Sequence, residues 1–376
     1  VYRIGRDDRE SVRAGFPDGG GHAPPHSRIV VRMNASEPIA VALVSLGCPK
    51  NLVDSERIGA ILAEGGCVVG APLDEADVIV VNTCGFISAA REESLEVIAE
   101  AVEYKQAGIA GRVVVAGCLV DRDAERLFEL APGIDAVVGV NSREQILDAV
   151  RGRGPLARID SCSGEAASDA VRLRLTPPHT AYLRISEGCS HRCTFCTIPA
   201  IRGPFRSKPP AGVIAEAREL IDDGAVELNL IGQDTTAYGQ DLPGSPGLSG
   251  LLHELDRLPG AAWLRLLYAY PQRFADGLIS AMAECEHVLP YVDIPLQHVN
   301  GEILRRMGRG TPREEIESLL TRLRQSIPDI VLRTTFIVGF PGETDEQFEE
   351  LLDFVRQARL DAAGVYSAVG YQLLHR

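Results

Sequence analysis

Hydrophobic and polar positions alternate in two separate series along the chain, and each series predicts strands followed by helices. The first series predicts strands at 41–46, 78–82, 113–116 and 136–138, with helical periodicity near 54–64, 88–106, 121–130 and 143–150. In the second of these helices, Leu95, Ile98 and Val102 fall on one face. Repeated strand–helix units are typical of a parallel sheet with helices packed on it. We therefore predict an N-terminal α/β sheet domain over residues 38–150.

The second series is longer and predicts strands at 181–185, 227–231, 263–268, 291–294, 331–338 and 364–367, with helical patterns between them. Six strand–helix units indicate a partial (β/α)6 barrel over residues 179–376 rather than a closed barrel of eight strands. In parallel folds of this kind, chemistry collects at the carboxyl ends of the strands.

Two helices of the second series have marked starting points. Thr311, Pro312 and Glu314 supply an N-cap, a proline at the first helical position and a capping-box glutamate. Thr344, with Gln347 three residues later, predicts a second capped start. The helix after Pro312 has an apolar face made of Ile316, Leu319, Leu320 and Leu323.

Two segments lack this periodicity. Residues 1–37 are rich in Gly, Pro, Arg and Asp and predict a disordered N-terminal tail. Residues 151–178 contain Gly, Ser and Pro clusters and predict a linker between the two domains. A length of 376 residues fits two or three domains. Because the sequence has neither a long apolar run nor a signal-peptide core, we expect a cytoplasmic protein that is not inserted in a membrane.

The formal net charge of −14 bears on which macromolecules the protein could bind. A protein whose main work is to grip phosphates usually has a basic face, so nucleic acid is not the expected primary partner. The acidic balance suits a basic protein partner.

The chain has nine cysteines, and three of them fall in the short segment Cys189, Cys193 and Cys196. Disulfides are not the default in a cytosolic protein, so metal binding is a candidate. Four cysteines would close a zinc or iron–sulfur site, whereas three leave one corner open for another ligand. A zinc knuckle with His191 as the fourth ligand is the alternative.

This CxxxCxxC segment, which follows the first strand of a predicted partial barrel, resembles that of the radical S-adenosylmethionine enzymes. The resemblance implies a [4Fe–4S] cluster on Cys189, Cys193 and Cys196 that cleaves S-adenosylmethionine to a 5′-deoxyadenosyl radical. It also implies contacts to S-adenosylmethionine from Phe195, Gln233, Gly339 and Glu343. His298, after the fourth strand, could bond the substrate or be structural.

Another set of cysteines follows the first three long strands of the N-terminal series. We call it the first set because it comes first in the chain, and Cys189, Cys193 and Cys196 are the second set. Cys48, Cys84 and Cys118 occupy the same topological place on parallel strands, so their side chains should converge at one sheet edge. Taken singly, each would most often be a small buried hydrophobe. Together they predict a second open cluster. Cys67, Cys162 and Cys285 have no partner spacing and are not assigned to the chemistry.

A three-cysteine sheet domain followed by such a barrel resembles the methylthiotransferases, which replace a C–H hydrogen with a methylthio group. The resemblance implies two [4Fe–4S] clusters, S-adenosylmethionine and an electron-donor protein such as flavodoxin or ferredoxin. The strings 45–56, 82–87, 196–208 and 232–239 resemble the ribosomal-protein branch of the family. The implied substrate is the β-carbon of an aspartate in the twelfth small-subunit ribosomal protein. A tRNA (adenosine) methylthiotransferase and a non-catalytic metal-binding scaffold are the alternatives.

Two further features bear on the substrate. Arg202, Arg206 and Lys208 could steer an acidic substrate side chain or a phosphate, although loop cations are usually just solvated. Family members continue into a small β-barrel of the TRAM type, whereas residues 365–376 lose the sequence expected there. We therefore expect a C-terminally truncated chain without the TRAM barrel.

Overall fold

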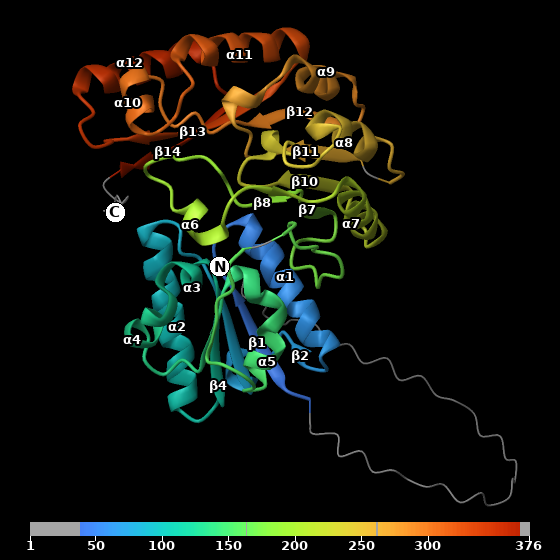
Figure 1. Ribbon diagram of the computed structural model, residues 1–376, viewed down its shortest axis with the longest axis vertical. Coiled ribbons are helices and arrows are strands. Elements are labelled where there is room, and N and C mark those ends of the chain that lie inside the picture. The colour runs from blue at the N-terminus through green and yellow to red at the C-terminus, as the bar shows by residue number, and fades with distance from the viewer. Residues whose placement is uncertain (1–37, 163, 261, 369–376) are drawn as a thin grey trace, which may run out of the picture.

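The computed structural model describes residues 38–162, 164–260 and 262–368 of the chain. Two parallel sheets, each of six strands, carry the fold, and the N-terminal sheet lies below the barrel in Figure 1. The predicted disordered tail, residues 1–37, lies outside the described residues. In the described part of the chain, no helix is both long and apolar enough to span a membrane.

The N-terminal sheet has the strand order β2-β1-β3-β4-β5-β6, and every neighbouring pair is parallel. Its strands are β1 (Ala40–Ser45), β2 (Val68–Val69), β3 (Val78–Thr83), β4 (Arg112–Gly117), β5 (Ala136–Val138) and β6 (Ala157–Arg158). Its helices are α1 (Pro49–Glu64), α2 (Ser88–Gln106), α3 (Cys118–Asp123), α4 (Leu127–Leu130) and α5 (Ile146–Val150), with short 3-10 segments at Leu73–Glu75, Ala124–Arg126 and Val140–Gln145.

Strand β3 shows why this sheet needs helices on both faces. All of its residues are buried, and successive side chains point to opposite faces. Ile79 and Val81 belong to the apolar cluster that includes Ile98 of α2. Val78 and Val80 belong to the cluster on the other face, with Ile58 and Leu62 of α1. The four long predicted strands are confirmed, whereas β2 and β6 were not predicted, because two-residue edge strands carry no periodic signal.

The second sheet has the order β14-β13-β12-β11-β10-β7, which is sequential and wholly parallel, as the predicted six-stranded partial barrel requires. Its strands are β7 (Thr180–Arg184), β10 (Glu227–Ile231), β11 (Trp263–Leu266), β12 (Val288–Asp293), β13 (Val331–Val338) and β14 (Ala362–Ser367). A small antiparallel pair, β8 (Ser186–Glu187) and β9 (Arg206–Ser207), flanks the loop that carries the second cysteine set.

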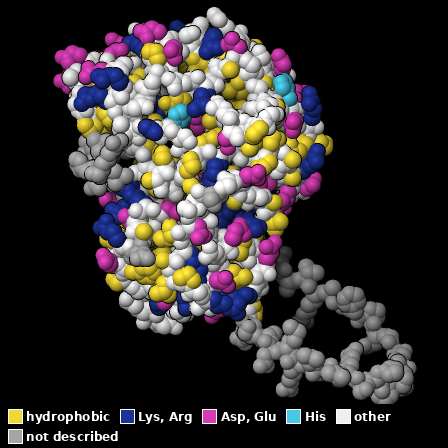
Figure 2. All heavy atoms as spheres, viewed as in Figure 1, with side chains coloured by type: hydrophobic (Ala, Val, Ile, Leu, Met, Phe, Trp, Pro, Cys, Tyr) yellow, Lys and Arg dark blue, Asp and Glu magenta, His cyan; other side chains and the backbone are white. Residues whose placement is uncertain are grey.

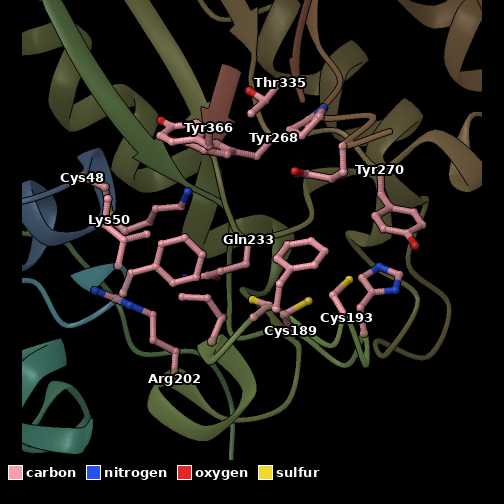
Figure 3. A pocket seen from close by; sticks show the side chains of 18 of the residues that line it. Cys48, Lys50, Cys189, Cys193, Arg202, Gln233, Tyr268, Tyr270, Thr335 and Tyr366 are labelled. Atoms are coloured by element: carbon pink, nitrogen blue, oxygen red, sulfur yellow. The ribbon is translucent and has the colours of Figure 1, made fainter. Parts of the chain in front are cut away.

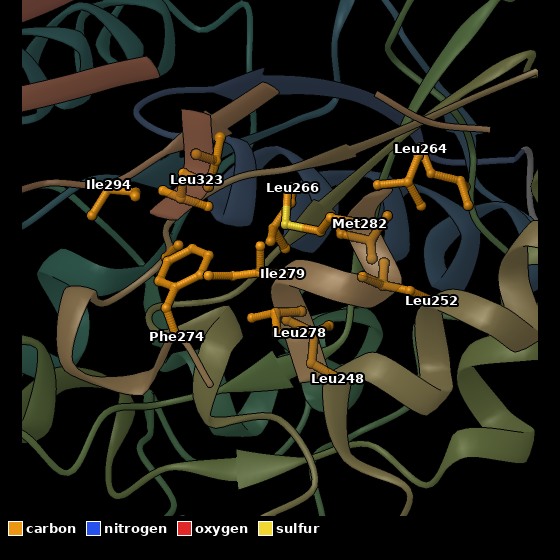
Figure 4. Close-up of a cluster of buried hydrophobic side chains, with 14 of the residues drawn as sticks. Leu248, Leu252, Leu264, Leu266, Phe274, Leu278, Ile279, Met282, Ile294 and Leu323 are labelled. Carbon is orange, nitrogen blue, oxygen red and sulfur yellow. The ribbon is translucent and has the colours of Figure 1, made fainter. Parts of the chain in front are cut away.

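Helices cover the outer face of the barrel sheet and bury one large core. They are α7 (Pro210–Asp222), α8 (Gly247–Asp256), α9 (Asp276–Glu284), α10 (Gly301–Arg306), α11 (Arg313–Ser326) and α12 (Asp345–Ala358), with 3-10 segments at Thr235–Ala237 and Pro271–Arg273. The short helix α6 (Ile198–Arg202) lies instead against α3 of the N-terminal domain. Figure 4 shows Leu264 and Leu266 of β11 packing with Leu278 and Met282 of α9. Such burial of leucine and methionine side chains contributes roughly 2 kcal/mol each.

The two predicted helix starts have different outcomes. Thr344 forms the predicted capping box: its hydroxyl accepts from the backbone N–H of Gln347, and the Gln347 side chain accepts from the backbone N–H of Thr344. The prediction for Thr311 is wrong, because Pro312 occupies the N-cap position of α11 in an extended conformation and, among the described residues, makes no side-chain capping bond.

The predicted linker 151–178 does more than connect the domains. Its residues Ala157–Arg158 form β6. Asp169 in the same segment is buried and binds Arg184 of the barrel and Arg143 of the N-terminal domain. This segment therefore packs into both halves of the molecule.

Candidate functional site

One cavity of about 360 Å³ opens between the two domains, and residues after the carboxyl ends of strands from both sheets line it. All six cysteines singled out in the sequence line this cavity, although they come from two different domains. Figure 3 shows Cys48 and Lys50 on one side of the space and Cys189 and Cys193 on another. Because the carboxyl ends of strands from both sheets face this cavity, both sets of cysteines belong to one site.

The first set converges because its three strands are neighbours. Cys48 is the N-cap residue of α1 after β1, Cys84 follows β3, and Cys118 is the first residue of α3 after β4. Gly47 lets the first two loops meet: it has a φ of +88°, and a Cβ there would lie 2.7 Å from the Cβ of Cys84. A larger residue at this position would push the Cys48 and Cys84 loops apart.

Asn51 holds these loops together, and its role could not be inferred from the sequence. Its Nδ2 donates to the carbonyls of Leu46 (2.6 Å) and Thr83 (3.1 Å), one on each loop. The Nδ2 of Asn82 donates in turn to the carbonyl of Asn51 at 2.9 Å. Both asparagines are fully buried. A polar residue in the first turn of a helix usually faces solvent. The sequence shows only that Asn51 lies close to Cys48, which does not predict this role.

The second set lies on the loop between β8 and α6, which backbone hydrogen bonds fix at both ends. The N–H of Cys189 donates to the carbonyl of Gly203, and the N–H of Cys196 donates to that of Cys193. In the middle, the N–H of Thr194 donates to the carbonyl of Met307 after α10. The loop is therefore attached to the barrel before any ligand binds.

His191 lies within this loop but is held by the barrel. Its Nε2 lies 2.7 Å from Oδ2 of Asp234, and its ring stacks on Tyr270 with centroids 3.8 Å apart. These contacts give His191 a role in positioning the loop. They take up the ring nitrogen Nε2, which the zinc-knuckle alternative would need unless Nδ1 served as the ligand.

The geometry of the thiols bears on the kind of metal group they could hold. Among the described residues, no group of three His, Cys, Asp or Glu side chains is arranged to hold a single metal ion. In a four-iron cube each thiolate binds a different iron, so its ligands lie further apart than those of one ion. The thiols of each set line the same cavity, and three such thiolates would be the protein ligands of a cube with an open iron.

Burial sets the protonation of these thiols. It raises the pKa of Cys118 and of Cys196 to about 12 and also raises the pKa of Cys84 and Cys189. Because thiolates and not thiols bind iron, cluster binding has to displace protons from these side chains.

The other residues predicted to contact S-adenosylmethionine fall into two groups. Phe195 and Gln233 line the cavity, and Nε2 of Gln233 donates to Glu187 at 2.8 Å. Gly339 and Glu343 are not among the described residues that line it. The Glu343 carboxylate is already used, by Nε2 of His298 at 3.2 Å and by the N–H of Phe340 at 2.9 Å.

His298 is a structural residue in this fold. It is fully buried, and its Nδ1 accepts from the N–H of Asn300 while its Nε2 bonds Glu343. Burial lowers the pKa of the imidazole despite the neighbouring carboxylate. Of the two roles considered for His298, the structure places it in the structural one, with both ring nitrogens engaged.

Two of the three basic residues after the cluster loop, Arg202 and Lys208, are buried in ion pairs and do not form an exposed steering surface. Lys208 is buried between Asp169 (2.7 Å) and Glu216 (2.6 Å). Arg202, also buried, binds Asp54 at 2.8 Å and Glu187 at 3.0 Å. The steering hypothesis is therefore wrong for these two, since carboxylates of the chain itself already neutralise them.

A buried ion-pair network joins the two domains at this point. Arg184 contacts Asp54 of α1, Asp169 of the connecting segment and Glu187. Burial alone would raise the pKa of Asp169, but Arg184, Lys208 and Arg143 hold it well below its usual range. Asp54 lies 130 residues from Arg184 in the sequence, so no local pattern could have revealed that this network joins the two domains.

Lys50 is a further cavity residue that sequence reasoning missed. Its side chain is buried, and its Nζ lies 2.9 Å from the centroid of the Tyr268 ring. Burial lowers the pKa of Lys50 to about 8. The only hint in the sequence was its position two residues after Cys48.

Comparison with known proteins covers both domains. Residues 183–355 match the radical SAM superfamily model, and residues 40–139 match a model described as uncharacterized protein family UPF0004. The ribosomal protein uS12 methylthiotransferase RimO of Pelotomaculum thermopropionicum is 47% identical over 333 residues, which cover 88% of this chain and 75% of that protein. The protein of the same name from Geobacter sulfurreducens is 45% identical over 337 residues, covering 89% and 75%.

Two solved structures share the fold at low sequence identity. The radical S-adenosylmethionine methyltransferase TsrM from Kitasatospora setae has a TM-score of 0.64 at 18% identity and covers 87% of this chain and 72% of its own. The cobalamin-dependent S-adenosylmethionine radical enzyme OxsB has a TM-score of 0.58 at 16% identity, covering 85% of this chain and 52% of its own.

On the surface of the molecule, Figure 2 shows acidic and basic side chains interspersed over the face in view.

Proposed function

The chain belongs to the family of ribosomal protein uS12 methylthiotransferases within the radical S-adenosylmethionine enzymes, and from this premise we propose that it attaches a methylthio group to the β-carbon of an aspartate in ribosomal protein uS12. The observation that carries the proposal is the meeting of two sets of three cysteines at one cavity. A single radical site would need only one set.

We assign the two sets different tasks. Cys189, Cys193 and Cys196 hold one [4Fe–4S] cluster through three of its irons, and the first set, after β1, β3 and β4, holds the other. When bound, the clusters and S-adenosylmethionine supply the sulfur, the methyl group and the radical that removes hydrogen from the substrate carbon. Both domains are needed because each contributes one set to the same cavity.

The remaining cavity residues orient S-adenosylmethionine and keep water out. Phe195 and Gln233 lie beside the second set, and the hydrogen bond from Gln233 to Glu187 fixes the amide. Tyr268 and Tyr270 add aromatic surface to the wall. An apolar wall limits solvent access, which protects a radical from side reactions.

The partners follow from the substrate and the chemistry. The acidic chain, with a net charge of −14, suits a basic ribosomal protein. We further propose that a small electron-transfer protein of the flavodoxin or ferredoxin type supplies electrons, and that the reaction takes place in the cytoplasm.

The decisive experiment compares the two classes of substrate. The enzyme, reconstituted anaerobically with iron and sulfide, is incubated with reductant, S-adenosylmethionine and either uS12 or tRNA. We expect the uS12 peptide that carries the target aspartate to gain one methylthio group in place of one hydrogen by mass spectrometry. Modification of tRNA without modification of uS12 would contradict the proposal.

A further inference from the structure

The cavity contains the ammonium group of Lys50, which forms no ion pair with any carboxylate of the described residues. Lys50 lies in the first turn of α1, two residues after Cys48, and is 7% exposed. Among the described residues, no carboxylate forms an ion pair with its ammonium group; the partner present is the face of Tyr268, 2.9 Å from Nζ to the ring centroid. Figure 3 shows Lys50 reaching from the Cys48 side toward Tyr268 and Tyr366.

The other cations of the cavity are held differently. Arg202 is neutralised by Asp54 and Glu187. Arg309 is held by a 2.7 Å hydrogen bond to the carbonyl of Pro295, and its guanidinium lies 4.4 Å from the centroid of Tyr270. Lys50 has no comparable hydrogen bond to a carboxylate or carbonyl among the described residues, so its donors remain free for an incoming group.

The energetics of this arrangement favour an anionic ligand. Burying an ammonium group without an anion is unfavourable, and an aromatic face offsets only part of that cost. The backbone next to Lys50 is fixed, because Asn51 donates to the carbonyls of Leu46 and Thr83 at the strand ends. A carboxylate entering the cavity would complete the ion pair in surroundings where such pairs are strong.

Besides the cluster that the proposed function places on Cys48, two carboxylates could reach this space, one from S-adenosylmethionine and one from the substrate. Lys50 comes from the N-terminal domain and follows a cysteine of the first set, whereas Phe195 and Gln233, the expected contacts for S-adenosylmethionine, belong to the barrel loops. Its position therefore favours the substrate. We propose that Lys50 is a specificity-determining residue whose ammonium group, presented on the face of Tyr268, binds the side-chain carboxylate of the substrate aspartate.

This inference rests on the proposed function. It explains how the enzyme would distinguish a substrate aspartate from an asparagine, whose side chain has nearly the same shape. An amide cannot neutralise the ammonium group, so its entry would leave the charge buried and unpaired. We expect the enzyme to bind the aspartate form of uS12 roughly 100-fold more tightly than the asparagine form.

The test measures binding without turnover. The reconstituted enzyme, with S-adenosylmethionine but without reductant, is titrated with labelled uS12 that carries either aspartate or asparagine at the target position. Lys50→Met should weaken binding of the aspartate form and bring the ratio of the two dissociation constants close to one, and Lys50→Arg should keep most of the preference. Lys105→Met, which removes an ammonium group paired with Asp135 outside the cavity, is the matched control and should keep the wild-type ratio.

Three results would overturn the inference. One is a wild-type enzyme that binds both forms equally, which needs no variant and so is independent of folding. Another is an unchanged ratio in Lys50→Met with normal iron content. The third is a loss of S-adenosylmethionine binding in Lys50→Met with an unchanged ratio, which would assign the ammonium group to the cofactor. Failure of the proposed function is distinct, because wild-type enzyme with reductant would then leave uS12 unmodified.

Discussion

Arg202 of the barrel and Cys118 of the N-terminal domain are joined across the domain interface by a 3.2 Å hydrogen bond from Nη2 to Sγ. The same nitrogen donates to Asp54 at 2.8 Å, and Nη1 donates to Glu187 at 3.0 Å. One buried guanidinium therefore contacts a cysteine of the first set, a helix of the N-terminal domain and the strand that precedes the cluster loop.

Replacing this guanidinium should change the reduction potential of the first-set cluster, whose ligand Cys118 it contacts, and not that of the second-set cluster. Hydrogen bonds to ligand sulfurs stabilise the reduced, more negative form of a cluster. We expect Arg202→Gln to lower the reduction potential of the first-set cluster, as measured by redox titration with EPR detection. The measurement is made in a chain that also carries alanine at Cys189, Cys193 and Cys196, so that only the first cluster contributes a signal.

The matched control is Arg309→Gln, since Nη1 of Arg309 lies 3.9 Å from Sγ of Cys193 in the second set. It should leave the first-set potential unchanged. Arg202→Gln should also lower the free energy of unfolding by about 3 kcal/mol, because buried carboxylates lose a partner. An unchanged first-set potential would show that the hydrogen bond does not influence the cluster.

The two cysteine sets should be separable by mutation. Cys84→Ala is expected to remove about four irons per chain while 5′-deoxyadenosine is still formed. Cys193→Ala should remove a similar number and abolish 5′-deoxyadenosine formation. Iron and sulfide analysis with a nucleoside assay checks both, and Cys285→Ala, at a buried thiol outside the cavity, should change neither. Loss of cleavage in Cys84→Ala would contradict the division of tasks.

Asp121 should make stability fall as the pH rises through the weakly acidic range. Its Oδ2 accepts from the N–H of Val140 at 2.7 Å, and burial raises its pKa from 3.8 to about 6. Between these values the folded state holds a proton that the unfolded state has lost, so this group's contribution declines from pH 4 to 6. Asp121→Asn keeps the acceptor without the charge and should be more stable than wild type by roughly 2 kcal/mol above pH 6.

Urea unfolding of both proteins at several pH values measures this difference. Below about pH 4 the two should approach each other, because Asp121 is then protonated in both states. Wild-type and variant stabilities that stay parallel from pH 4 to 7 would show that burial does not perturb this carboxyl.

The two threonines at helix starts provide a matched pair for stability. Thr344→Ala should lower the free energy of unfolding by about 1 kcal/mol, because it removes a capping hydroxyl. Thr311→Val should have no cost or a small gain, because the buried Oγ1 of Thr311 has no hydrogen-bond partner within the described part of the chain. Denaturant unfolding measures both, and an equal loss in the two variants would mean that the hydroxyl of Thr311 is bonded in solution.

Much of the fold could be predicted because it depends on short-range patterns. The long strands and the apolar faces of the helices follow hydrophobic periodicity, and all four residues of the predicted α11 face, Ile316, Leu319, Leu320 and Leu323, are buried. The local capping pattern gave a wrong prediction at the start of α11, because Pro312 and not Thr311 is the N-cap residue there.

The site was predictable only in part, for a different reason. That the cysteines of each set lie together follows from strand-end topology and close spacing. Both sets face one cavity only because of the way the two sheets pack together. Pairings between distant residues help to fix this packing, such as that of Arg202 with Asp54, 148 residues apart. Lys50 and Asn51 acquire their roles only from that docking and from the contact between strand ends.

The two sets of cysteines differ in how the chain brings them together, and this has a consequence for maturation. The second set occupies one short loop, so its thiols are neighbours even in a newly made, unfolded chain. The first set exists only after β1, β3 and β4 have paired. Under the proposed function, loading of the first-set cluster therefore requires a folded N-terminal sheet, whereas the ligands of the other cluster lie within one short segment whether or not the barrel has formed.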